Sequence, residues 1–177
     1  MKKLYGEQRR QILLEKLKSA DEPLTGAGLA AFANVSRQVI VGDMTLLKAK
    51  NEPIIATSQG YLYMSSQATQ EISRTIACHH QPEDTERELK ILVATGVTVK
   101  DVSVEHPVYG ELTAGIHVSN DKEVDVFMQR VHDTSASYLL ELTGGTHLHT
   151  ITAPNVAMLE QAIAVMRENG FLLEENE

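Results

Sequence analysis

Two histidines separated by a single residue, His147 and His149, are the side chains in this sequence that most directly suggest metal chemistry. In an extended strand, side chains two residues apart leave the same face, about 7 Å apart along the backbone. Their imidazoles could therefore share one ion. Gly144 and Gly145 precede them and would allow a tight turn or the close approach of a ligand. The simpler interpretation is that the two histidines only pack or form hydrogen bonds on a sheet face.

Further donors lie earlier in the chain, where His79 and His80 precede Pro82 and an acidic segment carrying Glu86 and Glu88. Spacing alone allows either histidine to supply a third ligand and either glutamate a fourth. A set of imidazoles and a carboxylate suits zinc, nickel, cobalt or iron. We interpret the other three histidines as surface or structural residues: His106, His117 and His132.

The elements that would hold these donors follow from hydrophobic periodicity. It predicts four strands and two helices, followed by one more helix and one short strand, with residues 138–142 unassigned: strand 72–79, helix 83–94, strands 97–105 and 111–118, helix 121–132, strand 146–153, helix 155–168 and strand 171–174. The first six elements have the βαββαβ order of a ferredoxin-like domain, so the expected class is α+β. Such a fold hosts many functions and constrains chemistry little.

The N-terminal third has a different pattern, that of a helix-turn-helix. Residues 7–18 predict an amphipathic helix, Thr25 caps a second helix ending near Phe32, and Asn34 and Val35 form the turn. Ser36 then caps a third helix whose apolar side chains recur at helical spacing: Ile40, Met44 and Leu47. Two short strands around Ser58-Gln59-Gly60 predict a hairpin, which would make this a winged helix-turn-helix.

The exposed face of the third helix predicts DNA contacts, because the first residues of such a helix meet base edges. Arg can pair with guanine and Gln with adenine. The predicted DNA-binding residues run along this helix and to the wing tip: Ser36, Arg37, Gln38, Val41, Thr45 and Gln59. Gly42 weakens the helix and Gln59 adds no positive charge to the wing, so we expect one winged helix to bind DNA weakly. We therefore expect a homodimer in which two such DNA-binding domains, or heads, bind together. A helical hairpin that binds only protein is the alternative.

The N-terminal third also differs from the rest of the chain in net charge. Residues 1–64 hold nine Lys and Arg against six Asp and Glu, a net +3, whereas the remainder holds seven against eighteen, a net -11. This asymmetry suits a DNA-facing head on an acidic body. We therefore predict a DNA-binding domain over residues 1–64, a linker over 65–71 and a second domain over 72–177.

Composition narrows the class of protein further. With 42% hydrophobic and 23% charged residues, the sequence is that of a soluble globular protein. No apolar run reaches the roughly 18 residues of a membrane span, and no secretory signal is visible, so we expect no membrane contact and a cytoplasmic location. Cys78, the single cysteine, is interpreted as a small buried hydrophobe.

Three segments together resemble a known family over essentially the whole chain: residues 35–41 (VSRQVIV), 104–110 (VEHPVYG) and 144–151 (GGTHLHTI). The sequence is similar to the niacin-responsive repressors of NAD biosynthesis and vitamin uptake, which join a biotin-repressor-type winged helix to a three-histidine domain. The resemblance implies His80, Glu88, His147 and His149 as the ligands of one divalent metal ion per subunit.

The resemblance also implies the function. We expect repression of niacin-uptake and NAD-salvage genes, with an inverted-repeat operator as partner and nicotinic acid or a related pyridine carboxylate as co-repressor, bound near Gly144, Gly145, His147 and His149. A bound cation with an open coordination position would attract such a carboxylate. We expect no enzymatic activity. The alternatives are a metal-dependent hydrolase fused to a DNA-binding head, for which Glu105 and His106 offer a general base, and a plain metal-ion sensor.

Overall fold

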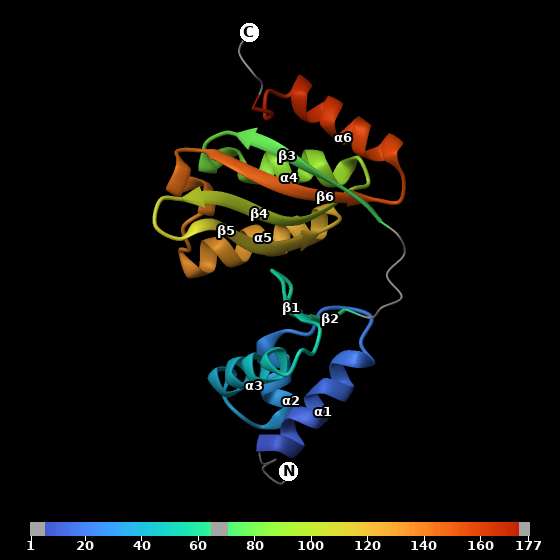
Figure 1. The fold of residues 1–177 in the computed structure, drawn as a ribbon, viewed down its shortest axis with the longest axis vertical. Helices are drawn as coiled ribbons and strands as arrows, with labels where there is room; N and C mark the ends of the chain where they lie inside the picture. Colours follow the sequence, from blue (N-terminus) through green and yellow to red (C-terminus); the bar gives the residue numbers. More distant parts are fainter. Residues whose placement is uncertain (1–5, 65–70, 174–177) are drawn as a thin grey trace. The chain divides into compact units, whose positions relative to one another are not determined.

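The computed structural model describes residues 6–64 and 71–173. The chain divides into two compact units, residues 1–68 and 69–177 (Figure 1). Each unit has its own hydrophobic core. Residues 65–70 of the predicted linker lie outside the described residues, whereas Glu71 pairs with Lys100 at the start of the second unit, 3.0 Å apart.

The first unit contains three helices and a hairpin: α1 (Gly6–Lys18), α2 (Gly26–Ala33), α3 (Arg37–Ala49), β1 (Ile54–Ala56) and β2 (Tyr61–Tyr63). The predicted caps are confirmed, because the Thr25 hydroxyl accepts a hydrogen bond from the Gly28 amide and the Ser36 hydroxyl accepts one from the Val39 amide. Such caps satisfy amides that the first helical turn leaves without partners. β1 and β2 pair antiparallel, as the hairpin prediction requires.

Apolar side chains at helical spacing build the core of this unit. Leu13 and Leu17 of α1 pack with Ile40, Met44 and Leu47 of α3, all at most 4% exposed. The opposite face of α3 stays exposed. The core therefore orients α3, as the sequence pattern predicted.

The second unit is a four-stranded antiparallel sheet with helices. Its elements, in chain order, are β3 (Ile72–His79), η1 (Pro82–Asp84), α4 (Thr85–Ala94), β4 (Thr98–His106), β5 (Gly110–Val118), α5 (Asp121–Thr134), η2 (Leu139–Thr143), β6 (Thr146–Ala153) and α6 (Val156–Glu168). The lateral order of the strands is β3-β6-β4-β5, with β6 antiparallel to both neighbours (Figure 1). The predicted βαββαβ order is confirmed, and η2 occupies the segment left unassigned.

Two details of the prediction need correction. In the ferredoxin fold the first and third strands are central, whereas here the second and fourth, β4 and β6, are central. The domain is α+β with split crossovers, but its strand order is not that of ferredoxin. The predicted last strand, 171–174, is in its described part only an isolated bridge between Leu172 and Cys78, because it follows the edge strand β3 too briefly to form a ladder.

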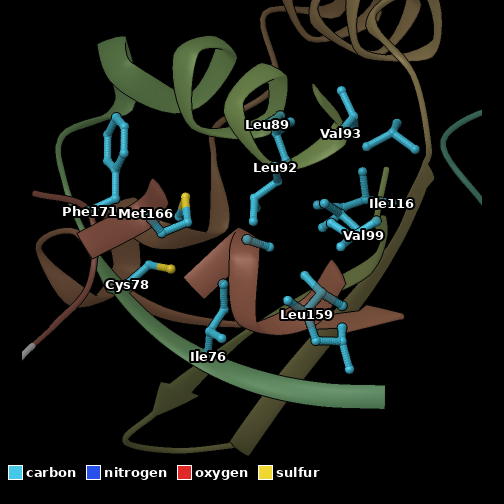
Figure 2. Packing of buried hydrophobic residues seen from close by; sticks show 14 of the residues in the cluster. Ile76, Cys78, Leu89, Leu92, Val93, Val99, Ile116, Leu159, Met166 and Phe171 are labelled. Carbon is cyan, nitrogen blue, oxygen red and sulfur yellow. The ribbon is translucent and has the colours of Figure 1, made fainter. Parts of the chain in front are cut away.

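The core of the second unit joins the sheet to all three helices. Figure 2 shows Leu89, Leu92 and Val93 of α4 above Ile76 and Cys78 of β3, in a cluster that also includes Met166 of α6. The strand residues of this core come from the sheet face that also carries His147 and His149, since Cys78 and Ile76 lie opposite these histidines in the pairing of β3 with β6. The two histidines therefore point into the interior.

Candidate functional site

Three histidines converge on one buried carboxylate in the second unit. The Nε2 atom of His80 lies 2.8 Å from Oε2 of Glu88, that of His149 lies 3.2 Å from the same oxygen, and that of His147 lies 3.3 Å from Oε1. All four residues are at most 6% exposed. These are the four residues that the family resemblance implied as metal ligands.

The other ring nitrogen of each histidine faces a backbone carbonyl. Nδ1 lies 2.7 Å from the Gln81 oxygen in His80, 2.9 Å from the Gly145 oxygen in His147, and 2.6 Å from the Asp101 oxygen in His149. A carbonyl can only accept a hydrogen bond, so each Nδ1 carries a proton and donates it. In a neutral imidazole, Nε2 then presents a lone pair toward Glu88.

Local backbone features aim these rings. His80 directly follows β3, and the short η1 helix turns the chain so that α4 returns Glu88 beside it. A β-bulge between Val99 and Asp101 in β4 lies next to the Asp101 carbonyl that holds His149. Bulges redirect a strand locally and are frequent beside functional sites.

Gly145 holds the chain segments of His80 and His147 together. Its φ is +105°, and its carbonyl accepts hydrogen bonds from both the His80 amide and the His147 ring. A Cβ at this position would lie 2.4 Å from the His80 carbonyl oxygen. Gly144 has a φ of +62° and open space around it. The two glycines therefore shape the turn, and neither lines the cavity beside the site.

Electrostatic coupling inside the cluster is strong. Burial alone would raise the pKa of Glu88, but the three surrounding imidazoles hold it well below its usual value. Burial likewise opposes protonation of His149 and His80, yet the Glu88 carboxylate raises the pKa of both. The cluster therefore attracts positive charge, either as protons or as a cation.

The donor set fits a transition metal ion. With neutral histidines, the three Nε2 lone pairs and the Glu88 oxygens are all acceptors, which face one another without a proton between them. A cation at their centre would satisfy all of them, whereas protons would leave buried imidazolium groups. The carbonyls behind each Nδ1 are the outer-shell partners typical of metal-bound histidine.

The sequence did not predict that Cys78 lies beside the histidine cluster. It is fully buried in the core, as predicted, but its Sγ, a carboxylate oxygen of Glu88 and a nitrogen of His147 all lie within 4.8 Å of one another. Burial and the nearby Glu88 carboxylate raise the pKa of the thiol. The signal that could have revealed it is strand pairing, because Cys78 lies directly opposite His147.

A cavity of about 200 Å³ adjoins the cluster. Glu88, His147 and His149 line one part, and the remainder is mostly apolar, with Leu89 of α4 and Phe127 of α5. Its size is below the roughly 300–1,000 Å³ of drug-sized sites, which suits a small ligand. The sequence did not reveal this cavity, because its walls come from α4, α5, η2 and the sheet.

The remaining histidines and Glu86 lie outside the cluster. His79 is exposed and its Nδ1 contacts the Thr146 hydroxyl, while Glu86 is exposed and pairs with Lys90. His132 has 86% of its side chain exposed, and His106 accepts hydrogen bonds from the amides of the following turn. His117 is half-buried, and burial lowers its pKa.

The predicted DNA-binding residues lie on α3, at its N-cap and at the hairpin turn of the first unit. Ser36, Arg37, Gln38, Val41 and Thr45 are all exposed along α3, and Gln59 is half-buried at the hairpin turn. The Thr45 hydroxyl donates to the Val41 carbonyl of its own helix, which leaves its oxygen available as an acceptor. The geometry suits insertion of the start of α3 into a major groove.

Comparisons with known proteins agree with both units. A family model described as "3H domain" matches residues 73–175, and one described as "HTH domain" matches residues 9–62. The chain is 55% identical over 175 residues to the transcription repressor NadR of Bacillus subtilis, covering 98% of this chain and 97% of that relative. It is 39% identical over 173 residues to the probable transcription repressor NiaR of Thermotoga maritima, covering 98% of both. This chain belongs to the 3H-domain family of transcription repressors. The resemblance inferred from the sequence is confirmed.

Several cations of the repressor's DNA-binding unit form ion pairs within that unit. Arg9 and Arg10 of α1 both pair with the buried carboxylate of Asp43 on α3, and Lys50 pairs with Glu7. These cations hold α1 against α3, so they are less available to DNA than unpaired ones. Arg37 has no ion pair among the residues that the structure describes, and its charge remains available for a base or phosphate.

Within the described ranges, the repressor has no helix with the length and apolar character needed to cross a bilayer.

Proposed function

We propose that this repressor controls genes of niacin uptake and NAD salvage, with nicotinic acid as co-repressor sensed by a metal-containing second domain. The observation that carries the proposal is the cluster of three histidines around Glu88 with a small apolar cavity beside it. The names of the two relatives, NadR and NiaR, support the link to NAD and niacin. A repressor of this kind acts in the cytoplasm, on chromosomal DNA.

The metal ion would be held by His80, Glu88, His147 and His149. Three imidazoles and one carboxylate suit zinc, nickel, cobalt or iron, and the donor set does not select among them. When bound, the ion supplies positive charge and a coordination position that a small anion can take. The chain's own contribution is to fix each Nε2 through the Nδ1 hydrogen bond behind it.

Nicotinic acid would lie in the cavity beside the ion. Its carboxylate is drawn to the cationic end lined by His147 and His149, and its ring meets apolar side chains such as Leu89 and Phe127. Burial of a flat ring against such side chains provides affinity, while the charged end orients the ligand. This role is one of binding, so the proposal assigns no enzymatic activity to the chain.

DNA recognition would use paired heads on an inverted-repeat operator. The exposed start of α3 carries few charges, so one head alone makes few phosphate contacts. Half-sites separated by about one helical turn, or a multiple of it, match a two-fold dimer. Nicotinic acid would favour the arrangement of heads that fits this spacing.

Dimerisation would occur mainly through the second unit, where several large apolar side chains are exposed. In the β4–β5 turn, Val108 is 77% exposed and Tyr109 is 74% exposed. Three leucines of this unit are also exposed: Leu142, Leu148 and Leu173. Pro107 of the turn, Leu148 and Leu173 line one groove of about 800 Å³. Exposed patches of large apolar side chains commonly mark protein interfaces.

A calorimetric titration of nicotinic acid into metal-loaded and metal-stripped full-length protein tests this proposal. We expect binding by the loaded protein, much weaker binding by the stripped protein, and tighter operator binding in a gel shift only when both metal and nicotinic acid are present. Operator binding that follows metal alone would make the chain a plain metal sensor. Nicotinic acid has no bond that a hydrolase could cleave, so metal-dependent hydrolysis of an added ester or amide would instead indicate a hydrolase.

A further inference from the structure

Thr85, the first residue of α4, has a buried hydroxyl that the fold does not use. The residue is 6% exposed, and its Oγ1 has no hydrogen-bond partner among residues 6–64 and 71–173. A buried polar group without a partner reduces stability, and most such groups in folded proteins are paired. A hydroxyl in this state is available to a partner that is not part of the chain.

Thr85 also lines the cavity beside the histidine cluster. Thr85, Glu88 and Leu89 occupy positions i, i+3 and i+4 of the helical turn, so all three face the cavity from one side of α4. Three residues of helix span about 4.5 Å. A six-membered ring could therefore have one polar group at the cluster and another polar atom near Thr85.

We propose that Thr85 is a specificity-determining residue that donates a hydrogen bond from its hydroxyl to the ring nitrogen of the effector. This inference rests on the proposed function, in which the carboxylate of nicotinic acid faces the cationic end of the cavity. The pyridine nitrogen is unprotonated at neutral pH and accepts a hydrogen bond. An apolar pocket accepts rings of similar shape, whereas a buried hydroxyl without another partner favours a ring that carries an acceptor.

The proposal explains how a mostly apolar cavity distinguishes a pyridine from a benzene ring. Without an acceptor opposite it, the Thr85 hydroxyl stays buried and unpaired when the ligand binds. With one, the hydroxyl gains a bond in an environment of low dielectric constant, where hydrogen bonds are stronger than in water. Thr85 thereby selects for the pyridine ring, while the cationic end of the cavity selects for the carboxylate.

The test replaces Thr85 with valine, which has nearly the same shape and a similar helix propensity but no hydroxyl. Thr152 provides a matched control, because it is equally buried in the same unit and lies on the opposite face of β6 from His147 and His149. Metal-loaded full-length wild type, Thr85→Val, Thr85→Ser and Thr152→Val are each titrated with nicotinic acid and with benzoic acid.

We expect Thr85→Val to weaken nicotinic acid binding about tenfold, as loss of one hydrogen bond implies. Thr85→Ser, which keeps the hydroxyl, should retain most of the affinity, and Thr152→Val should bind as wild type does. Benzoic acid affinity should be the same in Thr85→Val and wild type. An equal loss for both acids would overturn the proposal, because the hydroxyl would then bond to the carboxylate that both acids carry. Nicotinic acid binding by Thr85→Val as tight as by Thr152→Val would overturn the proposal.

The melting temperature supplies a second result that does not depend on nicotinic acid. If the hydroxyl is unpaired in the effector-free protein, Thr85→Val should melt at the wild-type temperature or up to about 4 °C higher. A lower melting temperature would show that the hydroxyl bonds within the chain, which contradicts the inference. If wild type fails to bind nicotinic acid, the proposed function is wrong, and this measurement still decides whether the Thr85 hydroxyl lacks a partner within the chain.

Discussion

Each histidine of the cluster uses its two ring nitrogens differently. Nδ1 donates to a backbone carbonyl and fixes the ring, which leaves Nε2 directed at Glu88. Because all four side chains are buried, the cluster cannot rely on water to separate its charges. The protonation of the cluster, and its contribution to stability, should therefore differ sharply between the metal-free and the metal-loaded protein.

Replacing His147 and His149 together by alanine should remove the metal. The change deletes two of four donors, and the remaining pair lacks the chelate formed by two imidazoles on one strand. Metal analysis of purified protein should fall from about one ion per subunit to near none. His106→Ala with His132→Ala, which removes two histidines outside the cluster, serves as the control and should keep its metal. A cluster variant that retains stoichiometric metal would reduce these histidines to a packing role.

The stabilisation by metal should grow with pH. Without metal, the raised pKa of His149 and His80 means that protonation stabilises the folded state below about pH 6.5, and this contribution is lost as pH rises through the folded-state pKa. With metal, the imidazoles must release those protons, so low pH weakens binding. The difference in melting temperature between loaded and stripped protein should therefore increase from pH 5.5 to pH 8. A difference that is constant over this range would exclude the histidines as ligands.

At the scale of elements, short turns and caps determine where the neighbouring helices and strands begin and how they are oriented. The Ser36 cap starts α3 so that its first residues are exposed, and the 144–145 turn brings η2 into β6 beside His80. In both places a few residues with specific backbone requirements decide where functional side chains lie.

Arg37→Ala should reduce specific DNA binding. A bidentate contact between arginine and guanine contributes about 1–3 kcal/mol of discrimination, so the ratio of operator to unrelated-DNA affinity should fall roughly tenfold or more in gel shifts. The melting temperature should not change, because Arg37 is exposed. Lys48→Ala removes the same charge from the last turn of α3 and should leave the ratio intact. If both variants behave alike, Arg37 contributes only general charge.

Gly145→Ala should be much more harmful than Gly144→Ala. Both positions have positive φ, which costs an L-residue about 1–2 kcal/mol, but only at Gly145 would the new Cβ also meet the His80 carbonyl oxygen. We expect about 1 kcal/mol of destabilisation for Gly144→Ala and more than about 3 kcal/mol for Gly145→Ala, with weaker metal binding, measured by denaturant unfolding and metal titration. Equal effects would argue against a tight approach of the two chain segments.

At the scale of the whole molecule, the exposed surface of α3 and the histidine cluster lie in two different compact units. Asp43 and its arginine partners stabilise the first unit internally, and the histidine cluster lies wholly in the second. In the proposed dimer, the way two chains assemble would couple the two units, so the surface that pairs the chains would matter as much as either site.

Val108→Ser with Tyr109→Ser should shift a dimer toward monomer. These are the most exposed large apolar side chains in the described parts of the chain, and their burial in an interface would contribute several kcal/mol. Sedimentation at micromolar concentration measures the change, and operator affinity should fall with it. Val126→Ser on α5, at a less exposed apolar position, is the control. A wild-type chain that sediments as a monomer would remove the basis for this prediction.

The sequence by itself determined local structure and the placement of His147 and His149 on one face of a strand. Caps at Thr25 and Ser36, the periodicity of α3 and the alternation of His147 and His149 depend on neighbours within a few residues, so they could be predicted. The choice of His80 over His79 and of Glu88 over Glu86 came from family resemblance, since spacing left both open.

Only the tertiary structure decided which strands are neighbours and what lies between them. Periodicity tells which face of a strand is buried, but lateral order depends on how all helices and strands pack together. Placing β6 between β3 and β4 puts Cys78 opposite His147 and brings the Asp101 carbonyl to His149. The cavity and the unpaired Thr85 hydroxyl arise in the same way, because their surroundings come from segments distant in sequence.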